Sequence, residues 1–169
     1  MNGMNSMDGE CPPFYGKYRG KVTDNDDPNG LGRIRVKAQD VLGDEESGWA
    51  LPATPYAGDG VGLYLIPPVD AFVWVEFEHG DPDYPIWTGC FWGTRDTVPG
   101  SGPDIKVLQT DTGTITIDDT DGDSSITIET TSGLKIVMDT GGIEISNGEQ
   151  KITLSAASVS VNDGALEVM

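Results

Sequence analysis

Acidic side chains are the most abundant groups in this chain that could do chemistry. Asp26-Asp27, Glu45-Glu46 and the couple Glu76 and Glu78 place two carboxyl groups close together. Carboxyl pairs hydrolyse glycosidic bonds when they face each other across a cleft and one of them has a raised pKa. These pairs instead fall in turns or on one strand face, where carboxylates are solvated. The sequence therefore predicts no catalytic residue and no enzyme.

Metal and thiol chemistry has few candidates. His79 is the single histidine and lies in a turn, and Cys11 and Cys90 are the two cysteines, so the three fall short of a zinc-binding set. Their spacing leaves open whether the cysteines pair, although free thiols are the commoner state in a cytosolic chain. Asp119–Asp123 partly matches a calcium loop, but its Gly is fourth and position twelve is Thr130, which indicates a solvated turn. We expect no metal and no cofactor.

The charge excludes further classes of partner. The net charge is −18, and residues 104–169 alone carry 12 acids and three bases. Such a surface repels nucleic acid phosphates and anionic lipid, so no nucleic acid partner is expected. No apolar run reaches the ~20 residues of a membrane span, and the first residues lack the basic and apolar regions of a signal peptide. These features predict folding and assembly in the cytoplasm.

The elements that must carry these residues are clearest in the last third of the chain. Seven very short segments alternate an apolar residue with Thr, Ser, Lys or Glu, the period-2 pattern of a strand with one dry face. Turn-forming pairs such as Asp121-Gly122 and Asn147-Gly148 separate them. The segments are 114–117, 125–128, 134–138, 143–145, 151–154, 159–161 and 166–168.

These strands are too short and too poor in aromatic residues to enclose a core within one chain. We expect three chains to combine into an intertwined triple-stranded β-helix, or β-prism, in which each chain supplies one wall and the apolar rows meet in the middle. A small two-sheet sandwich within one chain is the alternative, which the high Thr, Ser and Asp content disfavours. The predicted trimer core is Ile115, Ile117, Ile126, Ile128, Ile136, Met138, Ile143, Ile145, Ile152, Leu154, Val159 and Val161.

Residues 14–93 have a different character, because all four tryptophans lie there. Five strands, separated by Gly-rich corners, are predicted over 14–23, 32–37, 61–66, 71–78 and 84–92, which fits a small five-stranded OB-type barrel. Trp74 and Phe77 fall on opposite faces of one strand, which suggests contact with a neighbouring subunit as well as with the barrel core. The predicted domains are an arm (1–13), the OB barrel (14–93), a linker (94–104) and the trimeric spike (105–169).

An ordered set of motif residues runs through the barrel: Gly32, Arg33, Trp74, Phe77, Gly80, Asp81, Pro85 and Gly89. This set resembles the OB domain of phage baseplate hub and spike proteins. That group includes baseplate assembly protein V, the tail-lysozyme hubs and the VgrG proteins of type VI secretion. The resemblance covers 14–93, and the repetitive tail that follows extends it over nearly the whole chain. Asp70 departs from the pattern, which usually has Gly before the long strand.

The resemblance implies a structural function: a central, cell-puncturing spike in the baseplate of a contractile phage tail or related injection particle. It implies a homotrimer whose OB collar docks to a tail hub protein and whose shaft transiently contacts the target envelope. It also implies a PAAR-type tip protein, bound near Leu166, Val168 and Met169. The linker is too short to hold the lysozyme domain of the tail-lysozyme hubs. The alternatives are an OB module that binds oligonucleotides or oligosaccharides, and a peptidoglycan-hydrolase hub component.

Overall fold

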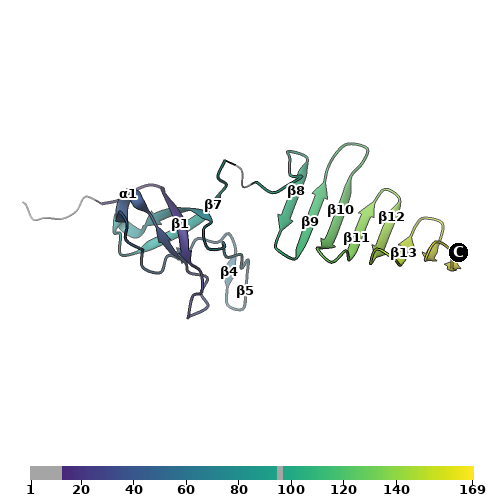
Figure 1. Ribbon diagram of the computed structural model, residues 1–169, viewed down its shortest axis with the longest axis horizontal. Coiled ribbons are helices and arrows are strands. Elements are labelled where there is room, and N and C mark those ends of the chain that lie inside the picture. Colours follow the sequence, from purple (N-terminus) through teal and green to yellow (C-terminus); the bar gives the residue numbers. More distant parts are fainter. Residues whose placement is uncertain (1–12, 95–96) are drawn as a thin grey trace, which may run out of the picture. The chain divides into compact units, whose positions relative to one another are not determined.

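The chain folds into two compact units, Met1–Arg95 and Asp96–Met169. The computed structural model describes residues 13–94 and 97–169 (Figure 1). Most of the arm predicted over 1–13, including Cys11, therefore lies outside the described residues. Within the described ranges, no helix has the length and apolar character needed to cross a membrane.

The first unit is a small β-barrel. Its sheet has the order β2-β1-β6-β7-β3, formed by β1 (Tyr18–Asp24), β2 (Arg35–Lys37), β3 (Leu51–Pro52), β6 (Phe72–Phe77) and β7 (Pro85–Phe91). A bridge between Ile34 and Ala50 joins the two edges of the sheet and closes the ring. The core inside it consists of Val22, Ile34, Val36, Ala50, Val73, Val75, Phe77 and Trp87.

The central strand β6 shows why the chain folds this way. Val73, Val75 and Phe77 alternate inward and are buried, while the residues between them face outward. Gly20 on β1 lies opposite Val73, and a Cβ added to it would lie 2.7 Å from a Val75 methyl carbon. The missing side chain therefore lets β1 approach the core closely.

The connections of the barrel differ in part from the sequence-based prediction. The strand predicted over 61–66 is shorter: β5 (Val61–Gly62) forms a two-pair hairpin with β4 (Ala57–Gly58), and residues 63–66 are not strand. The segment that follows β2 begins with the single-turn α1 (Gln39–Leu42), and η1 (Glu78–Gly80) links β6 to β7. Gly32 and Gly80 have φ of 73° and 79°, in the left-handed region that favours glycine.

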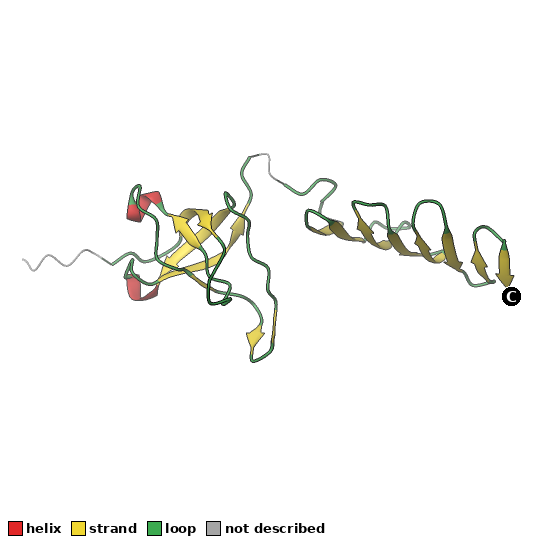
Figure 2. Ribbon diagram, turned by 60° about the horizontal axis from the view of Figure 1, so that its bottom comes forward, coloured by secondary structure: helices red, strands yellow, loops and turns green. Residues whose placement is uncertain are grey.

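The second unit is one antiparallel sheet in which each strand pairs with the next along the chain (Figures 1 and 2). Its eight strands are β8 (Ile105–Gln109), β9 (Gly113–Asp118), β10 (Ser125–Thr130), β11 (Lys135–Asp139), β12 (Gly142–Ser146), β13 (Lys151–Leu154), β14 (Val159–Val161) and β15 (Leu166–Val168). The positions of β9 to β15 confirm the seven predicted strands, whereas β8 was missed.

Asp70 adopts the left-handed conformation, with φ of 74°. Its backbone N–H donates to the Val22 carbonyl at 2.9 Å, and its carboxylate pairs with Lys21 at 2.7 Å. A side chain is strained at this φ. Asp70 in place of the usual glycine therefore strains the backbone at this position, but the turn still forms.

This strain predicts an order of stability among variants of Asp70. Asp70→Gly should unfold with a free energy about 1 kcal/mol higher than Asp70→Ala, because only glycine adopts this φ without strain. Chemical denaturation of both variants measures the difference. Equal stabilities, or a more stable alanine variant, would contradict the left-handed turn.

Candidate functional site

One face of the eight-stranded sheet carries two continuous rows of aliphatic side chains. The strand register aligns Ile115, Ile128, Ile136, Ile145, Ile152, Val161 and Leu166 in the first row, and Ile117, Ile126, Met138, Ile143, Leu154, Val159 and Val168 in the second. All twelve residues predicted to form a core lie in these rows. Leu166 and Val168, two of the residues predicted to contact a tip protein, extend the rows onto β15, and Met169 follows them fully exposed.

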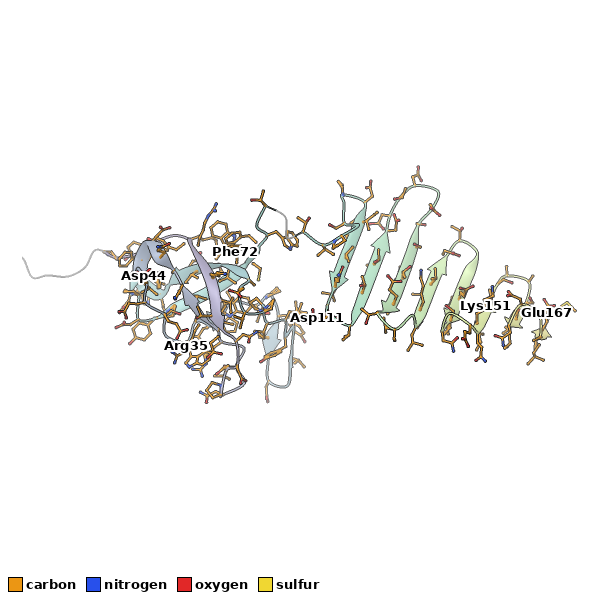
Figure 3. All side chains as sticks on the ribbon, in the orientation of Figure 1. Arg35, Asp44, Phe72, Asp111, Lys151 and Glu167 are labelled. Carbon is orange, nitrogen blue, oxygen red and sulfur yellow. The ribbon has the colours of Figure 1, made fainter. Side chains whose placement is uncertain are left out.

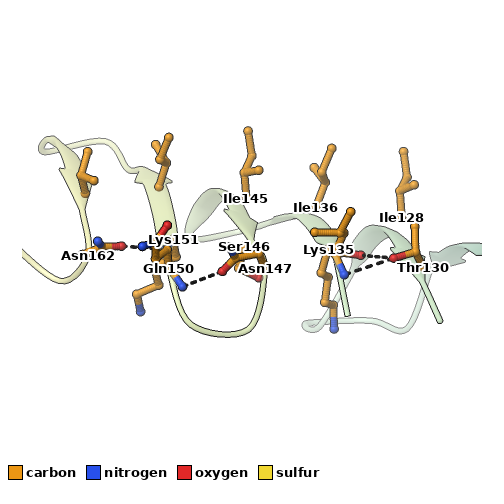
Figure 4. A pocket seen from close by; sticks show the side chains of 13 residues that line it. Ile128, Thr130, Lys135, Ile136, Ile145, Ser146, Asn147, Gln150, Lys151 and Asn162 are labelled. Carbon is orange, nitrogen blue, oxygen red and sulfur yellow. Dashed lines mark hydrogen bonds between the residues drawn. The ribbon is translucent and has the colours of Figure 1, made fainter. Parts of the chain in front are cut away.

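This aliphatic face is open in the single chain. The exposed fractions of its isoleucines range from 36% for Ile136 to 45% for Ile145. Ile128, Ile136 and Ile145 point the same way, side by side (Figure 4). Side chains stand along the whole length of this single layer of strands (Figure 3). A contiguous apolar surface of this extent marks an interaction site.

The opposite face of the sheet is polar and can remain exposed to solvent. A central row aligns Thr116, Thr127, Val137, Glu144, Thr153, Ser160 and Glu167. Lys135 lies 3.8 Å from Glu129, and Lys151 pairs with Glu144 at 3.8 Å and with Asp163 at 2.7 Å. The Asp163 hydrogen bond raises the pKa of Lys151. The sheet thus has one face that needs a partner and one that does not.

The hairpin turns are fixed locally by their own first residues. Asn147 Oδ1 accepts the backbone N–H of Gln150 at 2.7 Å, and Thr130 Oγ1 accepts that of Leu134 at 3.1 Å (Figure 4). Asp139 and Ser155 cap the turns that follow them in the same way. Asx and Ser/Thr turns of this kind set the register of each hairpin. The two aliphatic rows therefore stay aligned from strand to strand.

Strand β8 breaks the pattern. Its register places Lys106 and Leu108 on the aliphatic face, and Ile105 and Val107 on the polar one. Lys106 Nζ pairs with Asp119 at 2.5 Å. In β8 the alternating apolar residues Ile105 and Val107 therefore lie on the polar face of the sheet. Only Leu108 continues an aliphatic row beyond β9, and the other row ends at β9.

The OB motif residue Arg33 holds one turn of the barrel together with Asp27. Arg33 donates twice to Asp27, from Nη2 to Oδ1 at 2.6 Å and from Nε to Oδ2 at 3.1 Å. Asp27 also accepts the backbone N–H groups of Asn29 and Leu31, and its side chain is only 2% exposed. The Arg33 hydrogen bond is the main reason that the pKa of Asp27 lies well below its ordinary value. Sequence reasoning named Arg33 but did not pair it with Asp27.

The other motif residues are structural too. Phe77 is buried in the barrel, while Trp74 stands on the outer face opposite Gly89. A Cβ on Gly80 would lie 2.7 Å from the Pro13 side chain. Asp81 accepts the backbone N–H of Asp83 at 3.0 Å, and Pro85 is the buried first residue of β7. These contacts position turns and packing rather than a reacting group.

The groups considered for chemistry remain apart. The His79 side chain is 92% exposed, Cys90 is exposed on β7, and Asp119 to Asp123 form a turn closed by the Asp123 N–H and the Thr120 carbonyl. Across residues 13–94 and 97–169, no three His, Cys, Asp or Glu side chains gather to hold a metal ion. The aliphatic face is thus the most pronounced candidate site.

Comparison with known families assigns both units. Residues 18–92 match the type VI secretion system/phage-baseplate injector OB domain, and residues 105–167 match the phage baseplate V C-terminal trimerisation domain. The chain belongs to the phage baseplate V family. These matches confirm the predicted fold class, an OB domain followed by a trimeric β domain. The second of these family domains is a trimerisation domain, which supports a homotrimer.

Similar proteins include spike proteins of type VI secretion systems. The chain is 39% identical to VgrG4b of Pseudomonas aeruginosa over 72 residues, 40% identical to VgrG5 of the same species over 86, and 40% identical to VgrG3 of Vibrio cholerae over 72. These alignments cover 40%, 46% and 41% of this chain but only 9%, 11% and 7% of the relatives. A further relative is named as the actin cross-linking toxin VgrG1 of Vibrio cholerae. The chain thus spans about a tenth of the length of the relatives it matches.

The Asp27–Arg33 pair predicts an acid-sensitive stability of the barrel. Because folding lowers the pKa of Asp27, the pair stabilises the fold above the unfolded pKa of about 4 and loses that effect as the pH falls below it. Asp27→Asn should be less stable than the wild type at pH 7, and the difference should shrink as the pH drops toward 2. Denaturation curves across this pH range measure it. The exposed neighbour provides a control: Asp26→Asn should follow the wild type, and a gap for Asp27→Asn that does not depend on pH would refute the assignment.

Proposed function

We propose that this chain is the central spike of a contractile phage tail or of a related injection machine. Three sheets close around their aliphatic faces into a shaft, and three OB barrels form a collar. The observation that carries the proposal is the pair of open aliphatic rows within a domain whose family trimerises. The function is structural and needs no catalytic group.

Shaft dimensions fit a puncturing role. Eight strands leave seven spacings of ~4.8 Å, so each wall is about 34 Å long. Every strand of the wall is hydrogen-bonded to its neighbours, so breaking the wall across its length ruptures several backbone bonds together. The acidic outer surface keeps such a rod soluble and repels the like-charged envelope surface until it is driven forward. We infer that the shaft transmits force to the target envelope.

Two partners complete the proposal. A tail hub protein docks on the collar, and a PAAR-type tip protein binds beside β15, where Leu166 and Val168 are 61% and 59% exposed at an edge of the sheet. An unpaired edge strand with apolar side chains is a surface on which another chain can pair. The finished particle, a phage baseplate or injection particle, is the site of action.

The trimer is tested by matched substitutions on one strand. Ile128→Asp places three carboxylates, one from each wall, in the apolar interior that the three walls enclose, and burying an unpaired charge costs several kcal/mol per ion. We expect the concentration at which the trimer dissociates to rise at least about a thousandfold. Thr127→Asp adds the same charge to the neighbouring residue on the polar face and should leave the trimer intact. Sedimentation of both variants decides, and equal behaviour would contradict the assigned interior.

The tip contact is tested on β15. Leu166→Ala combined with Val168→Ala should abolish co-purification of the PAAR-type protein from the same machine, while the trimer mass stays unchanged, because alanine introduces no buried charge and the rows of β9 to β14 are intact. Glu167→Ala, on the opposite face of the same strand, is the control and should retain the tip protein. Undiminished capture by the double variant would remove the tip from the proposal.

A further inference from the structure

The outer surface of the barrel carries an aromatic face that the core does not use. Trp74 packs on Phe91 with 4.6 Å between ring centroids, and Phe72 stacks on Phe91 at 5.5 Å. The Arg19 guanidinium lies 5.8 Å from the Trp74 ring and 5.5 Å from the Phe91 ring. We call Arg19, Phe72, Trp74 and Phe91 the aromatic face.

Arg19 is a cation still available for a partner. Its neighbours along the chain are engaged: Lys17 pairs with Glu76 at 2.8 Å and Lys21 with Asp70 at 2.7 Å. Over the described residues, no carboxylate lies within ion-pair distance of Arg19. A guanidinium stacked on aromatic rings keeps its edge N–H groups free to donate to a carboxylate.

A second apolar surface lies on the β4–β5 hairpin, which stands out from the barrel (Figure 2). Tyr56, Val61, Leu63 and Leu65 are between 48% and 59% exposed. A cleft of about 580 Å³ separates the hairpin from the turn at residues 30–32. Asp59, at the hairpin tip, is the only charged residue between positions 53 and 66. We call Tyr56, Asp59, Val61, Leu63 and Leu65 the hairpin surface.

The two surfaces adjoin each other along β7. Thr88 and Gly89 line the cleft beneath the hairpin, and Gly89 is paired with Trp74 of the aromatic face. In a three-fold ring, contacts are heterologous, so each copy presents two different surfaces to its two neighbours. Both neighbours of a copy lie on the same side of it, toward the axis. The aromatic face and the hairpin surface adjoin each other, differ in composition and carry opposite charges, so they can serve as the two different contact surfaces of one copy.

We propose that the hairpin surface of each copy packs on the aromatic face of the next, with Asp59 pairing with Arg19 of its neighbour. The proposal rests on the trimer of the proposed function. A second copy is the favoured occupant because the trimerisation domain holds three barrels at high effective concentration. Charge complementarity also favours it, since the hairpin surface offers one anion and the aromatic face one unpaired cation. The three barrels therefore form a closed ring with three identical contacts, rather than three domains that do not touch one another.

Chemical cross-linking between chains of two sizes tests this contact. With Cys11 and Cys90 replaced by Ser, a tagged chain carries Arg19→Cys and an untagged chain carries Asp59→Cys. In every trimer that contains both kinds of chain, the hairpin surface of one untagged chain then faces the aromatic face of one tagged chain. This contact brings the cysteine at position 59 of the first chain close to the cysteine at position 19 of the second. A short bis-maleimide should join most mixed trimers into a covalent tagged–untagged dimer on a denaturing gel. The control pairs Arg19→Cys with Asp44→Cys, an exposed loop residue on neither surface, and should give no such band.

The outcomes separate this inference from the function on which it rests. A trimeric mass with the expected dimer band supports the ring. If the mass is trimeric but the band is absent, or equals that of the Asp44 control, the ring is overturned while the trimeric spike stands. If the chain is a monomer, the proposed function fails together with the ring.

Discussion

A single β-sheet with one aliphatic face is not stable in water by itself, and this constraint governs the second unit of the chain. Each strand from β9 to β15 contributes two aliphatic side chains to the same face, and the isoleucines among them remain more than a third exposed. No aromatic residue of this unit is available to fold back and cover them. Burial of the rows requires other walls, and identical copies supply walls of matching length and spacing. We therefore expect this unit to assemble as it folds rather than afterwards.

The chain separates two tasks that larger domains combine. Hydrogen bonds within each turn set the register of the strands. In successive hairpins the first residue of the turn accepts a backbone N–H from the same turn, as Asn147 and Thr130 do. Association then supplies the hydrophobic stabilisation. A short repeated sequence pattern is enough to specify such a wall, with polar and charged residues on its outer face and branched aliphatic residues on its inner face. The barrel is different, since its closed core is complete within one chain.

The sequence predicted the shaft better than the barrel, for physical reasons. Alternation and turn pairs are local, so β9 to β15 were found and their aliphatic residues fell on one face. Strand β8 was missed because Ile105 and Val107 point to the other face, which breaks the sequence repeat. In the barrel, the extent of β5 and the clamp between Asp27 and Arg33 depend on contacts across loops. Period-2 reasoning cannot supply such contacts. Asp70, in contrast, was singled out as a departure, and it does carry a left-handed φ.

The mass of the intact chain in solution tests the central claim most directly. Sedimentation equilibrium of the full 18.0 kDa polypeptide should give about 54 kDa, three times the chain mass, at every concentration down to the micromolar range. Its circular dichroism should show β structure throughout. A stably folded species of 18.0 kDa, with the isoleucine rows protected from solvent within one copy, would contradict the account.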